Sequence, residues 1–278
     1  MTQVDLLKKY GLSVRGRLGQ HILIDANVSR KIIQALELKP SDHVLEIGPG
    51  LGALSGEILA SGCRLAVVEK DPRFVQVLEQ ELKPHFGAKL EIACADFLEF
   101  DLEKLAAAGV PWKVISNLPY YVTAPILFRL FEHPALFSWA VLMMQKEVAR
   151  RLTASPGTKD YGRLTLGCQY FTKIRHVMDV SPPCFTPKPQ VDSSVVALTF
   201  SPPAQRVQKL DEERLFLLIR TAFSQRRKTL LHLAIKSPEF RKPRVELEKI
   251  FTCVGLEHNV RGESLSLDNF IALSRALA

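Results

Sequence analysis

The stretch LEIGPGLGALS, residues 45–55, decides the fold, because an apolar run passes through a glycine-rich turn into helical spacing. Gly48, Gly50 and Gly52 permit a tight turn in which a ligand can lie against bare backbone. The pattern therefore predicts a strand, a ligand-binding loop and a helix. It does not identify the cofactor: Gly48, Gly50 and Ala53 also fit the dinucleotide pattern G-x-G-x-x-A, so NAD stays open, as does a loop that serves packing alone.

Similar apolar runs recur on the C-terminal side of this stretch and alternate with helical spacing. Alternation of strands with helices of about ten residues predicts βαβ units and a parallel sheet. Nearly continuous apolar strands also fit a sheet that is covered on both faces. The expected strands are HVLEIG at 43–48, RLAVVEK at 64–70, LEIACAD at 90–96, WKVISN at 112–117 and WAVLMMQ at 139–145.

The pattern changes after the last of these strands. Residues 168–200 contain two β-type segments around a proline-rich connection, which predicts a hairpin-like addition at the sheet edge. Residues 201–209 have the composition of a linker, and apolar residues then recur at three- and four-residue spacing. We therefore predict an α/β domain over 1–204, with a basic N-terminal segment at 1–20, and a small all-helical domain over 205–278.

Composition narrows the class of protein. The 278 residues are 47% hydrophobic and 24% charged, which is typical of a globular protein, and the net charge of +8 favours an anionic partner such as nucleic acid. The five cysteines are dispersed without a CxxC pair, which argues against a disulfide framework or a zinc site. Because no apolar stretch approaches the roughly 20 residues of a membrane span, we expect a cytoplasmic protein without metal or membrane association.

Two acidic residues stand at the ends of expected strands. Glu69 ends a strand about 20 residues beyond Gly48, where a carboxylate can accept both ribose hydroxyls of an adenosine. Asp96 ends the next strand and can accept a hydrogen bond from the amino group of an adenine ring. Taken alone, Glu69 also fits a solvated strand-end charge and Asp96 fits a helix cap or turn. The register of Glu69 with the glycine loop favours the cofactor interpretation.

The motif NLPY, residues 117–120, follows another strand. The Asn117 side-chain oxygen can accept a hydrogen bond from an exocyclic amine, and Tyr120 can stack on a base. Pro119 has no N–H, so nearby carbonyl groups can face a ligand without a competing donor. Together these residues indicate a pocket for a planar base that carries an amine, rather than a proline turn with a core tyrosine.

These segments resemble the small-subunit (16S) ribosomal RNA adenine N6,N6-dimethyltransferases, the KsgA-type family. The matching segments are GQHILID (19–25), EIGPGLGALS (46–55), VVEKD (67–71), CADFLEF (94–100), NLPYYVTAPILFRL (117–130), FTPKPQVDSSVV (185–196), AFSQRRKTL (222–230) and RGESLSLDNFIAL (261–273). The resemblance implies a Rossmann-like class I S-adenosylmethionine-dependent methyltransferase sheet. It implies dimethylation of two adjacent adenines near the 3′ end of 16S rRNA, within the 30S subunit or its precursor, and a role in ribosome biogenesis. We expect a monomer.

The resemblance also implies residue roles. The expected cofactor-binding residues are His21, Leu23, Gly48, Glu69, Asp96 and Asn117. The expected residues around the target adenine are Asn117, Pro119, Tyr120 and Phe185. Hydrogen bonds from the target amine to the Asn117 oxygen and the Pro119 carbonyl would localise its lone pair, while Tyr120 and Phe185 would sandwich the flipped base.

The chain departs from the family pattern at two positions. His21 stands where the family usually has Asn. If the family's contact with the cofactor uses the backbone at this position, histidine serves equally. If it uses the Asn side-chain amide, we expect weaker cofactor binding. Tyr121 stands where many members have Asn, so contacts with the substrate at this position are left open.

The expected RNA contacts are basic residues, since phosphate contacts by Lys and Arg position a nucleic acid without reading its sequence. They are Lys8, Lys9, Arg15, Arg17, Arg150 and Arg151, together with QRRK (225–228) and FRKPR (240–244). Three alternative functions stay open: a 23S rRNA adenine methyltransferase of the antibiotic-resistance type, a 30S assembly factor with secondary or lost methylation, and an NAD-dependent oxidoreductase. The segment AFSQRRKTL favours the small-subunit enzyme.

Overall fold

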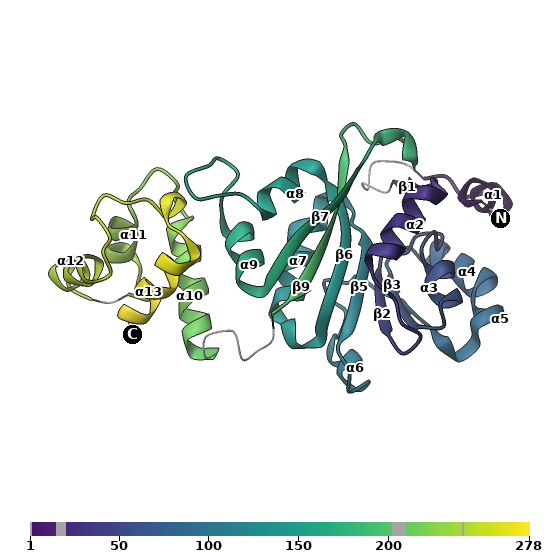
Figure 1. The fold of residues 1–278 in the computed structure, drawn as a ribbon, viewed down its shortest axis with the longest axis horizontal. Helices are drawn as coiled ribbons and strands as arrows, with labels where there is room; N and C mark the ends of the chain where they lie inside the picture. The colour runs from purple at the N-terminus through teal and green to yellow at the C-terminus, as the bar shows by residue number, and fades with distance from the viewer. Residues whose placement is uncertain (1, 15–20, 202–208, 241) are drawn as a thin grey trace. The chain divides into compact units, whose positions relative to one another are not determined.

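The computed structural model describes residues 2–14, 21–201, 209–240 and 242–278. The chain forms two compact units (Figure 1). Unit 1 comprises Met1–Ala149 and Thr172–Phe200, and unit 2 comprises Arg150–Phe171 and Ser201–Ala278. The division at residues 204 and 205 expected from the sequence stays a prediction. The contacts place one further segment, Arg150–Phe171, with the C-terminal helices, which no local pattern had indicated.

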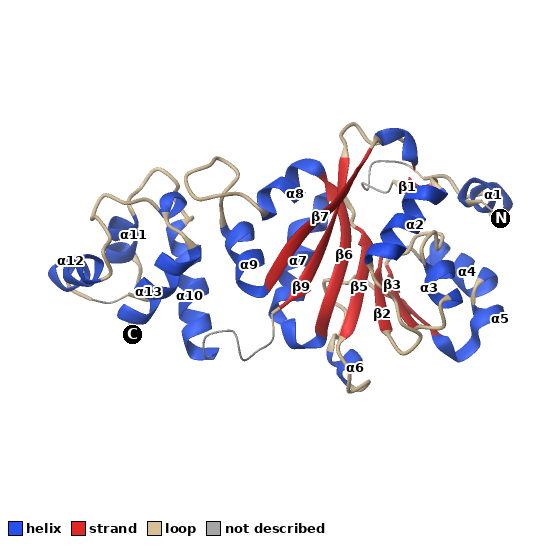
Figure 2. Cartoon of the chain, in the orientation of Figure 1, coloured by secondary structure: helices blue, strands red, loops and turns tan. Residues whose placement is uncertain are grey.

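Unit 1 is built on a mixed sheet (Figure 2). Within the described residues, its seven strands have the order β4-β3-β2-β5-β6-β9-β7. The strands from β2 to β6 are parallel, and β9 runs antiparallel to β6 and β7, so the predicted edge hairpin is confirmed. The strands are β2 (His43–Ile47), β3 (Arg64–Glu69), β4 (Leu90–Cys94), β5 (Trp112–Asn117), β6 (Phe137–Gln145), β7 (Thr172–Val180) and β9 (Ser193–Phe200).

A small second sheet pairs two segments that are far apart in the sequence. Strand β1 (Ile22–Leu23) runs antiparallel to β8 (Phe185–Thr186), with Leu23 opposite Phe185. Two-residue strands carry no periodic pattern, so the sequence analysis did not predict them. Their pairing holds Ile22 and Leu23 against the segment that begins at Phe185.

Side chains cap the N-termini of α1, α2 and α4 in unit 1. Asp25 caps α2 by accepting the N–H groups of Asn27 and Val28, and Asp71 caps α4, with Pro72 in its first turn. The helices are α1 (Gln3–Lys9), α2 (Ala26–Ala35), α3 (Ser55–Ala60), α4 (Pro72–Glu81), α5 (Lys83–Phe86), α6 (Glu103–Ala106), α7 (Thr123–Glu132), and the short η2 (Gly87–Lys89), η3 (Tyr120–Val122), η4 (Pro134–Leu136) and η5 (Pro182–Cys184).

The core of unit 1 joins helices to the sheet. Apolar side chains of α2, α3 and α4, among them Ile32, Ile58 and Leu78, share one buried cluster with Leu65 of β3 and Ile115 of β5. Burial of such side chains stabilises the fold by about 1.5–3 kcal/mol each. This packing holds the carboxyl ends of the strands at one edge of the sheet.

Unit 2 is helical in its described residues. Its helices, with α8 beginning in unit 1, are α8 (Lys146–Leu152), α9 (Arg163–Phe171), α10 (Lys209–Ala222), α11 (Leu230–Lys236), α12 (Arg244–Cys253), η7 (Gly262–Ser264) and α13 (Leu267–Ala276). Thr229 caps α11, so the QRRK run lies in the turn before this helix rather than inside it. The buried Tyr161 hydroxyl donates to the Leu265 carbonyl at 2.7 Å, which ties the Arg150–Phe171 segment to the C-terminal helices.

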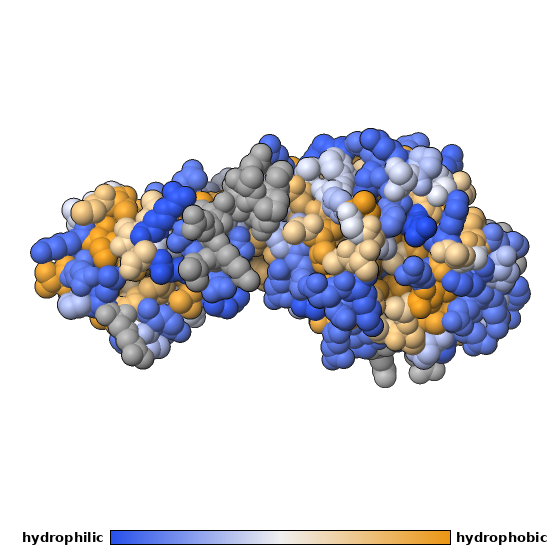
Figure 3. All heavy atoms as spheres, turned by 90° about the horizontal axis from the view of Figure 1, so that it is seen from below, coloured by the Kyte–Doolittle hydropathy of each residue, from blue (hydrophilic) through white to orange (hydrophobic). Residues whose placement is uncertain are grey.

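The surface is mainly polar on the face that Figure 3 shows, with apolar residues in scattered patches. Among the described residues, none of the helices has both the length and the apolar character that crossing a membrane requires. The same residues contain no group of three or more His, Cys, Asp or Glu side chains that could hold a metal ion.

Candidate active site

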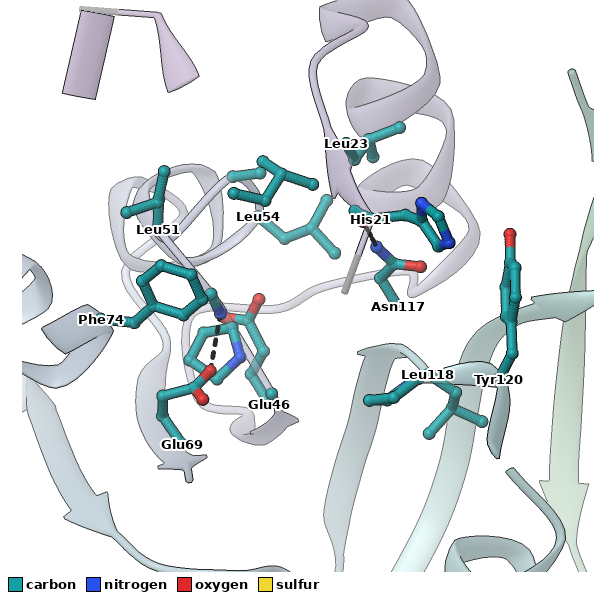
Figure 4. Close-up of a pocket in the computed structure, with 16 residues that line it drawn as sticks. His21, Leu23, Glu46, Leu51, Leu54, Glu69, Phe74, Asn117, Leu118 and Tyr120 are labelled. Atoms are coloured by element: carbon teal, nitrogen blue, oxygen red, sulfur yellow. Dashed lines mark hydrogen bonds between the residues drawn. The ribbon is translucent and has the colours of Figure 1, made fainter. Parts of the chain in front are cut away.

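A pocket opens at the carboxyl ends of β2, β3 and β5 (Figure 4). Its empty volume is about 720 Å³, open solvent included, and its lining contains His21, Leu23, Glu46, Gly48, Glu69, Asn117, Pro119 and Tyr120. A second hollow of about 1190 Å³, measured in the same way, shares Gly48, Glu69 and Pro119 with the pocket and reaches Asp96 beyond β4. The two hollows are therefore neighbours at the same edge of the sheet.

Strand order explains the arrangement of the site. The sheet order β4-β3-β2-β5 places Asp96, Glu69, Gly48 and Asn117 in a row, although their order along the chain is different. The chain direction across the sheet reverses beside β2, and a crevice forms at such a switch point in open α/β sheets. The sheet order therefore brings the four strand-end residues predicted from the sequence to one edge of the sheet.

The glycine loop presents bare backbone to this site. Gly48 and Gly50 have φ values of +63° and +58°, and a Cβ atom added at either would meet nothing within 4 Å. The loop therefore borders open space that a ligand can fill. The Glu69 carboxylate accepts the N–H of Gly50 at 3.0 Å and the N–H of Asp71 at 2.8 Å. Glu69 thus fixes the loop and keeps lone pairs for ligand hydroxyl groups.

Glu46 also lines the pocket, although it is not among the residues expected from the sequence. It is 2% exposed, lines the pocket and accepts the Ser55 hydroxyl at 2.5 Å. Burial, reinforced by the charge of Glu69, raises the pKa of Glu46 to about 7, and burial also raises the pKa of Glu69. The available signal was the acidic residue inside the apolar run HVLEI, since Glu is rarely buried.

The charge of the pocket favours a positively charged ligand. Glu46 and Glu69 are both buried there, and none of the described residues that line it is Lys or Arg. Such a pocket favours a cation, because a positive group would compensate the buried carboxylates. It does not suit the pyrophosphate of a dinucleotide, which the glycine pattern alone had left open.

Asn117 is oriented by a backbone contact. Its side-chain NH₂ donates to the His21 carbonyl oxygen at 2.9 Å, which leaves the Asn117 amide oxygen as a free acceptor. Figure 4 shows that oxygen directed toward the side of the pocket where Tyr120 lies. Because this contact uses the backbone of residue 21, it does not depend on the side chain there, and the contact of residue 21 with the cofactor stays a prediction.

The carbonyl groups of NLPY differ from the sequence-based expectation. The Pro119 oxygen already accepts the N–H of Val122 at 3.1 Å and the hydroxyl of Thr123 at 3.2 Å, so both of its lone pairs are engaged. The Leu118 carbonyl has no donor within the described part of the chain, and Leu118 also lines the pocket. The better second acceptor is therefore the Leu118 carbonyl.

Aromatic residues lie differently from the expected sandwich. Phe185 is 1% exposed, belongs to the core cluster and lines neither hollow, so the structure does not bring it to the pocket wall beside Tyr120. The His21 ring lies there instead, with its centroid 5.3 Å from that of Tyr120 and the planes tilted by 33°. The His21 ring also makes a 2.7 Å hydrogen bond with the Pro187 carbonyl.

The second hollow contains the remaining predicted residue. Asp96 accepts a hydrogen bond from Lys70 at 2.7 Å, and this contact lowers the pKa of Asp96. The carboxylate also accepts the N–H of Leu98, in the role of a turn aspartate. Tyr121, which is 61% exposed, lines the same hollow, whereas Tyr120 lines the pocket. The two tyrosines of the doublet thus serve different halves of the site.

The basic residues of unit 2 divide into paired and unpaired groups. Arg226 donates to the carbonyls of Lys159 at 2.9 Å and Tyr161 at 3.1 Å, and its Nε lies 3.5 Å from Glu263. Its neighbours Arg227 and Lys228 are exposed and have no partner among the described residues.

Other expected RNA contacts are also paired. Lys242 and Arg244 form ion pairs with acidic residues one turn later in the chain, at 2.8 Å and 2.7 Å, and Arg150 lies 3.0 Å from Asp160. Arg15, Arg17 and Arg241 lie outside the described residues.

Comparisons with known proteins agree on one family. The family model "Ribosomal RNA adenine dimethylase" matches residues 11–271. A protein of Bacillus cytotoxicus named "Ribosomal RNA small subunit methyltransferase A" is 40% identical over 98% of this chain and 94% of its own length. A protein of Bacillus mycoides with the same name is 38% identical over 98% and 94%.

Solved structures show the same fold. A dimethyladenosine transferase from Plasmodium falciparum has a TM-score of 0.77 and 27% identity, over 91% of this chain and 96% of its own. The 23S rRNA methyltransferase ErmE has a TM-score of 0.66 and 24% identity over 92% and 99%, which supports the fold alone. The relatives' names favour the small-subunit function over the 23S alternative. The expected fold, enzyme class and family are thus confirmed: the chain belongs to the ribosomal RNA adenine dimethylase family of methyltransferases.

Proposed function

We propose that the chain transfers methyl groups from S-adenosylmethionine to the N6 amines of two adjacent adenines near the 3′ end of 16S rRNA. Its substrate is the 30S subunit or a precursor of it, and it acts in the cytoplasm as a monomer during ribosome biogenesis. The observation that carries the proposal is the oriented amide of Asn117, whose free oxygen is directed toward Tyr120 in a pocket that the glycine loop and the buried carboxylates also line.

The residues present fit the cofactor. S-adenosylmethionine, when bound, supplies an electrophilic methyl group on a positively charged sulfur. Glu46 and Glu69 provide the negative environment for that charge, and the bare backbone at Gly48 leaves room for the methionine part. Glu69 holds the ribose hydroxyls, and Asp96 in the second hollow accepts from the adenine amino group. His21 and Leu23, from the N-terminal part of the chain, line the pocket that contains Glu46 and Glu69.

The target amine needs activation, because its lone pair is delocalised into the adenine ring. Two acceptors arranged around the nitrogen draw its hydrogens out of the ring plane and localise the lone pair. We assign these acceptors to the Asn117 amide oxygen and the Leu118 carbonyl, since the Pro119 carbonyl is engaged. Positioning of this kind supplies much of the rate in a transfer between two bound groups.

Base stacking completes the target pocket. Tyr120 offers its ring face to a flipped adenine, and burial raises the pKa of its hydroxyl, which stays protonated. Phe185 serves as the second face only if its side chain leaves the core. No side chain acts as a general base in this scheme, because the amine becomes cationic on transfer and loses its proton to water.

A second methylation places a further demand on the pocket. The monomethylated amine has one N–H left, so a single hydrogen bond to Asn117 or Leu118 must hold it. The family's product, dimethyladenine, therefore requires that one acceptor suffices. A final product of monomethyladenine alone would contradict this arrangement.

The RNA contact is assigned to unpaired cations. Arg227 and Lys228 are exposed and free of ion pairs within the described residues, which suits phosphate contacts. Arg226 is already committed to two carbonyl groups and is assigned a structural role.

The test is methyl transfer from radiolabelled S-adenosylmethionine to unmethylated 30S subunits, 50S subunits and free 16S rRNA. We expect two methyl groups on each of two adenines in the 30S subunit, and loss of transfer in Asn117→Ala. Transfer to 50S subunits instead would establish the 23S alternative. Retained 30S binding without transfer would identify an assembly factor.

A further inference from the structure

The Tyr120 hydroxyl forms a hydrogen bond with a buried serine, Ser193. The two hydroxyl oxygens lie 2.7 Å apart, and either oxygen can be the donor. Ser193 is 0% exposed and is the first residue of β9, where it pairs with Gln145 of β6 and with Val180 of β7. A residue fixed between two strands offers a rigid anchor for the tip of the tyrosine.

The other end of Tyr120 is fixed as well. The residue opens η3 directly after Pro119, and its ring contacts the ring of His21. The hydroxyl contact therefore determines the remaining freedom of the side chain, which is rotation of the ring out of the pocket. Tyr120 is half-buried, so a hydroxyl that loses its partner there can regain one from water if the ring turns out of the pocket.

We propose that Ser193 is a positioning residue for the reaction, which holds the Tyr120 ring at the angle that receives the target adenine. This inference rests on the proposed function, because it assigns a role to Ser193 in presenting the base. Ser193 lines neither the pocket nor the second hollow, so it acts through Tyr120 and not by contact with the cofactor.

The two hydroxyl groups allow a double-mutant cycle. Ser193→Ala leaves the Tyr120 hydroxyl without its partner, and we expect kcat/KM for the 30S subunit to fall about tenfold, the factor for ~1.4 kcal/mol. Tyr120→Phe keeps the ring and removes the other hydroxyl, so it also lowers the rate. The double variant has no unpaired hydroxyl from this contact, and we expect it to be more active than Ser193→Ala alone.

A matched control lies next in the chain. Ser194 is equally buried, but it points to the opposite face of β9 and donates to Asp179 at 2.6 Å. We expect Ser194→Ala to leave kcat/KM unchanged even if it lowers thermal stability. Binding of S-adenosylmethionine, measured by calorimetry, should stay within about twofold in all variants because the hydrogen bond from Asn117 to the His21 backbone is untouched.

Stacking can be observed directly with 2-aminopurine in place of the target adenine. Its fluorescence should be quenched when it binds the wild-type protein and less quenched when it binds Ser193→Ala. Binding to the double variant should restore the stronger quenching. A double variant no better than Ser193→Ala in both rate and quenching would overturn the inference, since Ser193 would then act through packing alone. Absence of methyl transfer by the wild-type protein would instead overturn the proposed function.

Discussion

Replacing Glu46 with glutamine is expected to stabilise the ligand-free protein at alkaline pH and to weaken cofactor binding. Glu46 is 2% exposed, and burial raises its pKa from 4.5 to about 7. A rise of this size corresponds to ~3 kcal/mol between the two protonation states. Glutamine keeps an oxygen that can accept from Ser55, so the change removes the charge and little else.

The sign of the pH dependence follows from the raised pKa. Folding favours protonated Glu46, so its contribution to stability is full below about pH 4.5 and is lost as the pH rises through about 7. The glutamine variant lacks this titration. Its advantage in the free energy of unfolding should therefore be smallest below about pH 4.5 and grow by up to ~3 kcal/mol above about pH 8.

Denaturant unfolding at several pH values measures this difference. Glu57→Gln is the matched control, because Glu57 lies on the neighbouring helix α3 and is exposed. A stability difference between Glu46→Gln and the wild type that does not change with pH would refute the argument that buried charge at Glu46 opposes folding.

Cofactor binding provides a second test of the charge on Glu46. A positively charged ligand favours ionised Glu46, so the wild-type protein should release protons on binding at about pH 6–7. Calorimetry in two buffers with different ionisation enthalpies measures that release. Glu46→Gln should release fewer protons and bind more weakly, and equal release by both proteins would show that Glu46 does not sense the ligand.

Four further substitutions test the pocket and the basic residues of unit 2. Asn117→Ala should lower single-turnover methyl transfer by about 100-fold or more, and a loss below tenfold would contradict its acceptor role. Gly50→Ala places a Cβ on a residue whose φ is +58°. Calorimetry should show cofactor binding weakened by at least about tenfold, and unchanged binding would contradict the role of the glycine loop in holding the cofactor. Arg226→Ala should lower the melting temperature by several degrees, whereas Arg227→Ala should instead reduce the salt slope of RNA binding by about one; the reverse pattern would contradict their assigned roles.

Local patterns were sufficient for the main elements. The five predicted parallel strands are present within one or two residues of their expected bounds, and Pro72 and Asp71 begin α4 as their types favour. These features depend on side-chain periodicity and capping, which neighbouring residues determine. The helical run after residue 205 was also found, although QRRK lies in a turn because the cap at Thr229 starts α11.

The sequence by itself also determined the chemistry of the strand ends. Glu69, Asp96 and Asn117 were identified because polar side chains after buried strands point to a ligand crevice, and NLPY narrowed the ligand to a base with an amine. These inferences need residue types and the position of each strand end. They do not need the strand order.

Only the tertiary structure decided which atoms are available. The sheet order sets Asp96, Glu69, Gly48 and Asn117 in a row, and the His21 carbonyl, 96 residues away in the chain, orients the Asn117 amide. Hydrogen bonds occupy the Pro119 carbonyl, and burial removes Phe185 from the pocket wall. Hydrogen-bond partners and burial arise from groups that are distant in the sequence, so residue type alone cannot determine which acceptor or ring meets the substrate.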